Sequence, residues 1–242
     1  MRAVLTDIEG TTTAVAFVYD ILFPYAAARL EEFCAAPPAG DPEAAEALVR
    51  LAEEYQEEAR SIPAPADLPA FGDGAPYARY LMEQDRKSTG LKQLQGAIWG
   101  RGYRDGTLRG HVFPDVPSAL AAWTAAGVRL RVFSSGSVRA QRLLFAHTDY
   151  GDLTGHFESF HDTTTGPKLE AGSYAAIAAA FGLPPADILF LSDHTGELDA
   201  AAAAGLRTGC VLRPGNAPVD PGPHPAYRSF AELSPHPLLK NQ

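Results

Sequence analysis

The chain has 242 residues, of which 46% are hydrophobic and 20% are charged. A chain of this length and composition buries a full hydrophobic core, which excludes a fibrous or intrinsically disordered protein. The formal net charge is −9, so the chain lacks the basic surplus of a sequence-independent nucleic-acid binder, and we expect no nucleic-acid partner. A few placed cations and amides can nevertheless bind a small anion.

The cysteine count and the apolar runs indicate a cellular compartment. Only Cys34 and Cys210 are present, so at most one disulfide is possible, and we expect both thiols to be reduced and structural. The first residues contain no signal-peptide apolar region, and no uninterrupted apolar run approaches membrane-spanning length. We therefore expect a cytoplasmic protein without a membrane partner.

The first predicted element is a short buried strand. Val4 and Leu5 open an apolar stretch that ends in the polar, turn-prone run Asp7-Ile8-Glu9-Gly10-Thr11-Thr12. The carboxylates of Asp7 and Glu9 should therefore lie at the carboxyl end of this strand.

Residues 17–109 have a mainly helical pattern. A helix is predicted over 43–60, with Asp41 as its N-cap and Pro42 in its first turn. Its apolar positions recur at helical spacing: Ala44, Leu48, Leu51, Tyr55 and Ala59. A stretch rich in Pro, Ala, Gly and Asp at 61–76 divides the region into helical pieces. We interpret 17–109 as a helical cap domain.

The remainder of the chain alternates between helices and strands. The predicted elements are helix 117–126, strand 128–133, helix 138–147, helix 171–181, strand 188–191, helix 197–204 and strand 208–212, followed by an irregular surface segment from Pro214. Such alternation is typical of a parallel sheet with helices on both faces. The predicted fold is thus α/β: a Rossmann-like doubly wound parallel sheet formed by 1–16 and 110–242, with an inserted α-helical cap domain.

Carboxylates follow two of the predicted strands, at the edge where open parallel sheets bind ligands. An aspartate in the position of Asp7 can act as a nucleophile toward phosphorus; alternatively, it caps the following turn. Glu9 lies two residues on and should project to the same side. With Asp193 from another strand end, these residues suit a hard cation such as Mg²⁺, although Asp193 is also a candidate N-cap for the next helix.

Hydroxyl groups and one lysine are candidates for holding a phosphate group. Ser134 and Ser135 follow a strand and precede a helix, where hydroxyls and free amides can bind phosphate oxygens; a helix cap is the simpler interpretation. Lys168 could neutralise charge on the phosphate and on Asp7, whereas a lone loop lysine is usually solvated.

The order of these motifs resembles that of the haloacid dehalogenase-like superfamily: an aspartate after the first strand, a serine after a later one, then a lysine, then an acidic loop. Several segments resemble, within it, the enolase-phosphatases of methionine salvage (acireductone synthases). They are DIEGTT, VFSSGSVRAQRLLF, residues 168–174, FLSDHTGELDAA, RPGNAP and LKQLQGAIWGRGYRDGTLRGHVFPDV. The likeness spans nearly the whole chain and is weakest over 31–78.

The resemblance implies a magnesium-dependent phosphoric monoester hydrolase. The family's substrate is 2,3-diketo-5-methylthiopentyl 1-phosphate, a small molecule that is enolised and then dephosphorylated through an aspartyl-phosphate. The products are acireductone (1,2-dihydroxy-5-methylthiopent-1-en-3-one) and phosphate. By the same resemblance we expect one Mg²⁺ per chain and a monomer.

The resemblance also implies roles for individual residues. The catalytic residues would be Asp7 as nucleophile, Glu9 in proton transfer, and Lys168. The metal ligands would be Asp7, the backbone carbonyl of Glu9, and Asp193. The substrate phosphate would be bound by Ser134, Ser135 and Lys168.

Three alternatives remain open. A phosphatase of the same fold could act on another small phosphate ester, because cap domains select substrates. A binding module without catalysis would lack the nucleophile, the lysine or the metal aspartate, and all three are present. A dehalogenase would have no use for a metal site. Glu197 is equally consistent with orienting metal-bound waters and with a helix's first turn, where negative charge is favoured.

Overall fold

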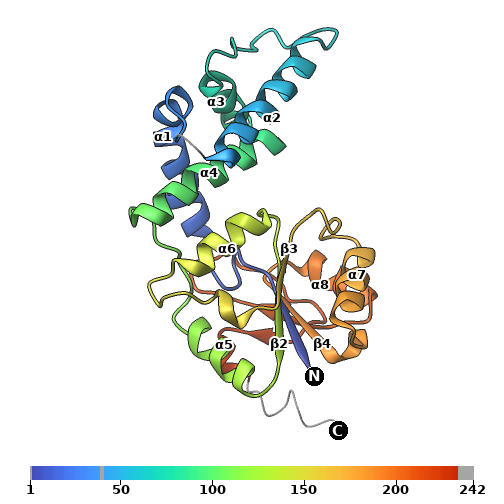
Figure 1. Cartoon of the computed structure of the whole chain (residues 1–242). Helices are drawn as coiled ribbons and strands as arrows, with labels where there is room; N and C mark the ends of the chain where they lie inside the picture. The colour runs from blue at the N-terminus through green and yellow to red at the C-terminus, as the bar shows by residue number, and fades with distance from the viewer. Residues whose placement is uncertain (1, 39–40, 234–242) are drawn as a thin grey trace. The chain divides into compact units, whose positions relative to one another are not determined.

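The chain folds into two compact units in the computed structural model, which describes residues 2–38 and 41–233. One unit comprises Met1–Val18 and Arg109–Gln242, and the other comprises Tyr19–Leu108. The first contains a β-sheet with helices, whereas the second is helical (Figure 1). We call them the sheet unit and the helical unit.

The sheet unit is built on six parallel strands in the order β3-β2-β1-β4-β5-β6. The strands are β1 (Ala3–Thr6), β2 (Arg129–Phe133), β3 (Ser159–His161), β4 (Ile188–Ser192), β5 (Arg207–Val211) and β6 (Ala226–Tyr227). β1 lies between β2 and β4, and all its residues are buried, as expected for a strand covered on both faces. The predicted parallel α/β fold is confirmed.

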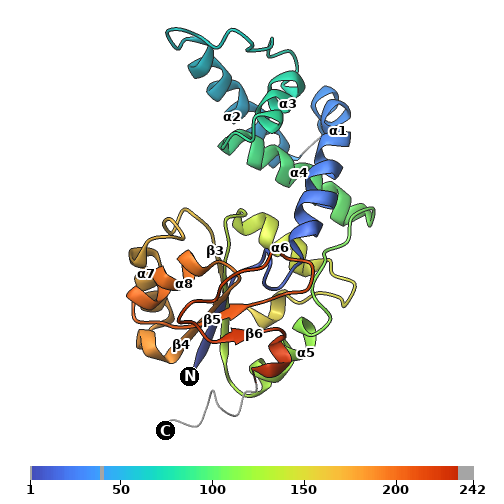
Figure 2. The same cartoon turned by 180° about the vertical axis from the view of Figure 1, so that it is seen from behind.

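Helices cover both faces of this sheet. α5 (Val116–Ala125) and α6 (Val138–Ala146) lie on one side, and α7 (Ala171–Phe181) and α8 (Thr195–Ala203) lie on the other (Figures 1 and 2). On the α7 and α8 side, apolar side chains of those helices and of the strands form one buried cluster. This arrangement is the doubly wound architecture that the alternating pattern predicted.

Two short strands were not predicted. β3 has three residues and β6 has two, too few for a periodic pattern to be visible. β6 lies in the segment from Pro214 that we expected to be irregular. There the backbone amide of Cys210 donates to the Pro225 carbonyl at 2.8 Å, and that of Leu212 donates to the Tyr227 carbonyl at 2.7 Å. Residues 234–242 of that segment lie outside the described residues.

The C-terminal segment also contributes to the core. Phe230 is fully buried, and its ring lies 5.2 Å from that of Trp123 in α5. The indole N–H of Trp123 donates to the Leu233 carbonyl at 3.0 Å, which satisfies its one polar group. Residues 214–233 are therefore an integral part of the sheet unit rather than a surface wrap.

The helical unit contains α1 (Phe23–Ala35), α2 (Pro42–Ala59), α3 (Ala75–Glu83) and α4 (Thr89–Asp105), and a π-helical stretch (Phe17–Leu22) precedes α1. Asp41 caps α2 as predicted, since its side chain accepts from the amides of residues 43 and 44 at 3.1 and 3.3 Å. Ala44 and Leu51 are buried, but Ala59 is exposed because it is the last residue of the helix.

α2 and α4 pack closely at one glycine. A Cβ added to Gly90 would lie 2.7 Å from the Cα of Leu51, closer than carbon atoms approach in proteins. Glu54 of α2 accepts hydrogen bonds from the amides of Thr89 and Gly90, each at 3.1 Å, and so caps the start of α4. A carboxylate of α2 thus satisfies two of the amides at the start of α4, and the N-cap Ser88 accepts from a third, that of Leu91, at 2.9 Å.

Within residues 2–38 and 41–233, no helix has both the length and the hydropathy that a transmembrane span requires.

Candidate active site

The loop after β1 holds Asp7 in a fixed position. The amide of Asp7 donates to the Leu191 carbonyl at 2.9 Å and continues the pairing of β1 with β4. The carbonyl of Ile8 then accepts from the amides of residues 11, 12 and 13, at 3.1, 2.9 and 2.9 Å, which folds the loop back on itself. The amide of Ile8 donates to Asp7 Oδ1 at 2.7 Å. The carboxylate is therefore oriented by the loop that follows it.

Lys168 connects two carboxylates. Its Nζ lies 2.9 Å from Asp7 Oδ1 and 2.7 Å from Glu197 Oε2, and its side chain is only 8% exposed. Burial alone lowers the pKa of Lys168, but the two carboxylates raise it more, so that the net shift is upward and the group stays an ammonium. The Lys168 ammonium and the Ile8 amide both donate to Asp7 Oδ1. Within the described residues, no donor contacts Asp7 Oδ2.

Glu197 is fixed by its own neighbours. Ser192 Oγ donates to Glu197 Oε2 at 3.0 Å, and His194 caps α8 because its Nδ1 accepts from the amide of Glu197 at 3.3 Å. The alternative interpretation of Asp193 as the N-cap of this helix is therefore wrong. Glu197 does lie in the first turn of α8, yet its carboxylate points to Lys168, a contact that neither of our two interpretations anticipated.

Glu9 and Asp193 lie close to Asp7 in a partly buried environment. Burial, followed by repulsion from Asp7, raises the pKa of Asp193 to about 6. Burial, followed by repulsion from Asp7 and Asp193, raises the pKa of Glu9 to about 7. The carboxylates of Asp7, Glu9 and Asp193 thus repel one another, and Lys168 offsets only part of this repulsion.

The backbone at Gly10 closely approaches the acidic site. Gly10 has a φ of +71°, a left-handed conformation that glycine adopts without strain. A Cβ at this position would collide with Oδ2 of Asp193. The loop therefore depends on glycine to bring its backbone against the carboxylate.

The two serines differ in their surroundings. Ser134 follows β2, the neighbour of β1, and is buried, with its Oγ accepting from the Gly136 amide at 3.4 Å. Ser135 is exposed. The N-cap of α6 is Ser137, so neither predicted serine caps this helix. Within residues 2–38 and 41–233, no hydrogen bond joins Ser134 or Ser135 to Asp7 or Lys168.

Two polar residues of the RPGNAP segment, Arg213 and Asn216, contact the loop that follows β1. Neither was among the predicted site residues. Arg213 Nε donates to the Thr11 carbonyl at 2.8 Å, and Asn216 Nδ2 donates to the Gly10 carbonyl at 2.9 Å and to Asp193 Oδ2 at 3.1 Å. Their only signal in the sequence is the likeness of the RPGNAP text to the enolase-phosphatases. Nothing in its local pattern indicates that it contacts residues about 200 positions earlier.

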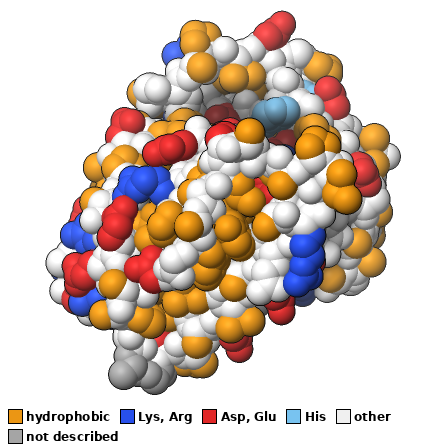
Figure 3. Space-filling model, turned by 90° about the horizontal axis from the view of Figure 1, so that it is seen from above, with side chains coloured by type: hydrophobic (Ala, Val, Ile, Leu, Met, Phe, Trp, Pro, Cys, Tyr) orange, Lys and Arg blue, Asp and Glu red, His pale blue; other side chains and the backbone are white. Residues whose placement is uncertain are grey.

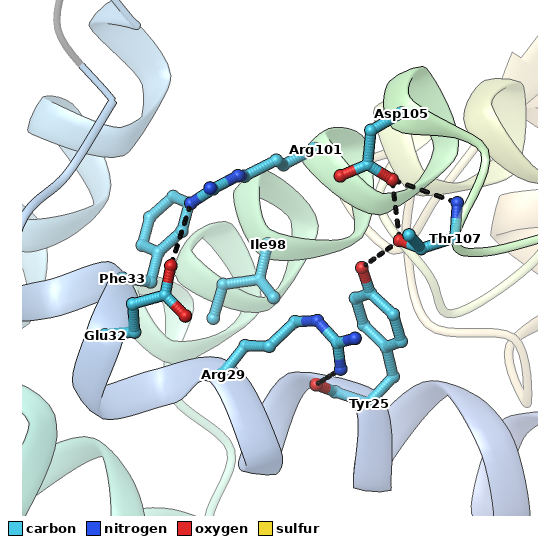
Figure 4. Close-up of a pocket in the computed structure, with 8 residues that line it drawn as sticks. All are labelled: Tyr25, Arg29, Glu32, Phe33, Ile98, Arg101, Asp105 and Thr107. Carbon is cyan, nitrogen blue, oxygen red and sulfur yellow. Dashed lines mark hydrogen bonds and ion pairs between the residues drawn. The ribbon is translucent and has the colours of Figure 1, made fainter.

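The helical unit contains a separate pocket of about 220 Å³ between α1 and α4 (Figure 4). It is lined by Tyr25, Arg29, Glu32, Phe33, Ile98, Arg101, Asp105 and Thr107. Each charged group of the pocket has a partner within it: Arg101 lies 3.7 Å from Glu32, Asp105 accepts from Thr107, and Arg29 donates to the Tyr25 carbonyl at 3.5 Å. On the face shown in Figure 3, Lys and Arg side chains lie in separate small groups.

Comparisons with known proteins identify the family of this chain. Residues 1–205 match the family model described as haloacid dehalogenase-like hydrolase. The protein named Enolase-phosphatase E1 of Synechococcus elongatus is 51% identical over 238 residues, which cover 96% of this chain and 98% of that protein. The protein of the same name from Sorangium cellulosum is 51% identical over 236 residues, 97% of each chain.

One solved structure extends the likeness to the fold. The crystal structure of the UTR4 protein of Saccharomyces cerevisiae superposes with a TM-score of 0.77 and 31% identity, covering 95% of this chain and 98% of that one. This chain therefore belongs to the haloacid dehalogenase-like hydrolases and, within them, to the enolase-phosphatase family.

Proposed function

We propose that this enzyme is a bifunctional enolase-phosphatase that converts 2,3-diketo-5-methylthiopentyl 1-phosphate to acireductone and phosphate in methionine salvage. The observation that carries the proposal is the Asp7 carboxylate at the end of β1, with Oδ1 bound by Lys168 and by a backbone amide. The relatives that are 51% identical over nearly the whole chain support the choice of substrate.

In the enolisation half-reaction, a proton leaves C1 of the substrate and another arrives at the C2 oxygen. Glu9 is our candidate for this proton transfer, because its carboxylate follows Asp7 by two residues and lies in the same partly buried cluster. The product of this step is an enol phosphate with an unchanged phosphate ester.

In the phosphatase half-reaction, Asp7 Oδ2 attacks phosphorus. The bond between phosphorus and the C1 oxygen breaks, and the electron pair stays on that oxygen, which takes up a proton. Water then attacks the phosphorus of the aspartyl-phosphate, and this step releases phosphate and restores the carboxylate. Lys168 neutralises negative charge on Asp7 and on the phosphoryl oxygens during both steps.

The donors at this site fit Mg²⁺. The ligands would be the carboxylates of Asp7 and Asp193 and the backbone carbonyl of Glu9, consistent with the preference of Mg²⁺ for one or two carboxylates, further oxygens and water. Within the described part of the chain, no three His, Cys, Asp or Glu side chains form a metal-binding cluster, so such a site relies on backbone and water oxygens. When bound, the ion supplies positive charge to phosphoryl oxygens.

The remaining assignments follow from the same proposal. Ser134, at the carboxyl end of β2, and the exposed Ser135 would bind phosphate oxygens together with Lys168. The helical unit would act as the cap that selects the substrate, and one chain would suffice for activity. Light scattering on the purified enzyme tests the last point, since a stable dimer would double the expected mass.

Turnover of the diketone phosphate tests the proposed function. Phosphate release is measured with Mg²⁺ and with a chelator, while ultraviolet absorbance follows the enol and the acireductone. Magnesium-dependent release together with that chromophore is expected. Release of phosphate from sugar phosphates but not from the diketone would contradict the choice of substrate and favour a phosphatase acting on another small ester.

A further inference from the structure

The segment Arg213–Asn216 lies beside the loop that follows β1. The Nδ2 of Asn216 lies within hydrogen-bond distance of two oxygens, the Gly10 carbonyl at 2.9 Å and Asp193 Oδ2 at 3.1 Å. Both partners are acceptors, so the amide nitrogen must face them; the opposite orientation would put the amide oxygen against two oxygens. The direction of this side chain is thereby determined.

Asn216 joins three parts of the chain that are distant in sequence. Gly10 belongs to the loop after β1, Asp193 follows β4, and Asn216 lies beyond β5. A Cβ at Gly10 would lie 2.9 Å from Asn216 Nδ2 and would collide with Asp193. Arg213 binds the carbonyl of Thr11, the next residue in the loop, at 2.8 Å. Two consecutive loop carbonyls are thus held by one short segment.

The carboxylate that accepts the hydrogen bond from Asn216 lies close to a second negative charge. Asp193 is partly buried and repelled by Asp7, and in the described residues Asn216 is the only side chain that donates a hydrogen bond to it. A donor fixed to Oδ2 restricts rotation of the carboxylate and leaves Oδ1 for another partner. Neutral groups that orient a carboxylate ligand commonly control metal affinity.

We propose that Asn216 is a positioning residue that fixes the Asp193 carboxylate against the Gly10 carbonyl and so sets the affinity of the site for a divalent cation. This inference rests on the proposed function, in which Asp7 and Asp193 bind Mg²⁺. In this role Asn216 acts through its hydrogen bonds to Asp193 and to the Gly10 carbonyl.

Calorimetric titration of the metal-free, full-length protein with Mg²⁺ tests this role directly. Asn216→Leu keeps the approximate shape of the side chain but removes both hydrogen bonds. The variant should bind Mg²⁺ about 10-fold more weakly than the native protein, or weaker still. Its kcat should recover at saturating Mg²⁺ and its KM for the phosphate substrate should not change, a split that a general loss of structure would not produce.

Matched variants separate positioning from stability. Thr208→Val removes a 2.8 Å hydrogen bond to His224 in the same C-terminal region and should leave the Mg²⁺ affinity unchanged. Asn216→Ala is the second variant if Asn216→Leu does not fold, and the same loss of affinity is expected. Gly10→Ala should also weaken Mg²⁺ binding, because the added Cβ would collide with Asp193 Oδ2 and would displace this carboxylate.

Two results would overturn the inference. If a folded Asn216→Leu protein binds Mg²⁺ as tightly as the native protein, Asn216 does not position the site, although the proposed function stands. If the native protein itself binds no Mg²⁺ in the calorimeter, both the metal role in the proposed function and this inference are wrong.

Discussion

One ion pair from each unit illustrates two opposite environments. In the sheet unit, Lys168 and Asp7 form a pair whose side chains are 8% and 7% exposed. In the helical unit, Arg79 pairs with Glu31 on the surface, where the side chains are 42% and 60% exposed. An exposed pair contributes little to stability, whereas a buried pair must overcome the cost of removing two charges from water. The burial of Lys168 and Asp7 is therefore evidence for chemistry rather than for stabilisation.

The apolar cores of the units follow the same principles. In the helical unit, apolar side chains at helical spacing on α1 to α4 form one buried cluster. In the sheet unit, the cluster between the sheet and the helices α7 and α8 combines residues of strands and helices. Both units are held by apolar packing, so their difference lies in the polar groups that each unit buries. Substitutions of these polar groups therefore test the difference between the two units.

The largest effect is expected for Asp7→Asn. The amide has nearly the shape of the carboxylate but is a far weaker nucleophile, so kcat for phosphate release should fall by about 10⁴-fold or more. Steady-state phosphate release checks this, with circular dichroism to confirm that the variant folds. Retention of more than a tenth of the activity would show that the buried carboxylate is not the nucleophile.

The largest loss of stability is expected when one partner of a buried ion pair outside the acidic cluster is removed. Asp115 accepts from Arg213, from Ser229 Oγ and from the Phe230 amide, at 2.7, 2.7 and 2.6 Å. Asp115→Ala leaves the Arg213 guanidinium buried without its partner, which should lower the free energy of unfolding by about 3–5 kcal/mol. Urea denaturation measures this change.

The matched variant for that experiment is Arg79→Ala in the helical unit. It breaks an exposed pair and should cost no more than about 1 kcal/mol. If Asp115→Ala and Arg79→Ala lower the free energy of unfolding equally, burial of the ion pair does not determine the size of the effect.

A smaller effect on catalysis is expected for Glu197→Gln. Lys168 then loses one of its two carboxylate partners but keeps Asp7, so its ammonium should be less well oriented. We expect kcat to fall by roughly 10- to 100-fold, since such supporting groups contribute that much to site function. Steady-state kinetics at saturating substrate measure it. An unchanged kcat would show that the contact with Lys168 has no role in turnover.

The smallest effect concerns pH. Burial lowers the pKa of His111 below its ordinary value of 6.5, and Asp149 offsets only part of this shift. As the pH falls, His111 is therefore protonated in the unfolded chain at a higher pH than in the folded protein. The stability that depends on neutral His111 is present above about pH 6.5 and is lost as the pH falls below that value. His111 Nδ1 accepts from the Ala14 amide at 3.2 Å, which requires an unprotonated Nδ1.

His111→Asn tests this pH dependence because it keeps an acceptor near the same position without titrating. The free energy of unfolding is measured between about pH 7 and pH 5, the range in which histidine titrates. The native protein should lose more stability over this range than the variant. Identical pH profiles would show that His111 does not contribute.

The sequence predicted the parallel sheet and the long, periodic elements well. Strand 128–133 and helix 171–181 agree with β2 and α7, because buried apolar runs and helical spacing are local properties. β3 and β6 were missed because two or three residues carry no periodicity. The segment from Pro214 was misjudged because its hydrogen bonds and its buried Phe230 depend on partners elsewhere in the fold.

The site was predictable only in part, for the same reason. Asp7 and Lys168 stand out because each is a charged residue beside a strand end or in a short loop, and they meet in the structure. The contact of Glu197 with Lys168 and that of Asn216 with Asp193 were not predictable, since each joins loops that are brought together only by the sheet.

Trapping the covalent intermediate tests the central claim that Asp7 carries the phosphoryl group. The enzyme is mixed with ³²P-labelled substrate, quenched in acid within the first turnover and reduced with borohydride, which converts an aspartyl-phosphate to homoserine. Protein-bound label in the quenched sample, and homoserine at position 7 in the peptide map of the reduced sample, are the expected results. Full turnover without label, or with modification at a different residue, would contradict the assignment of Asp7 as the nucleophile.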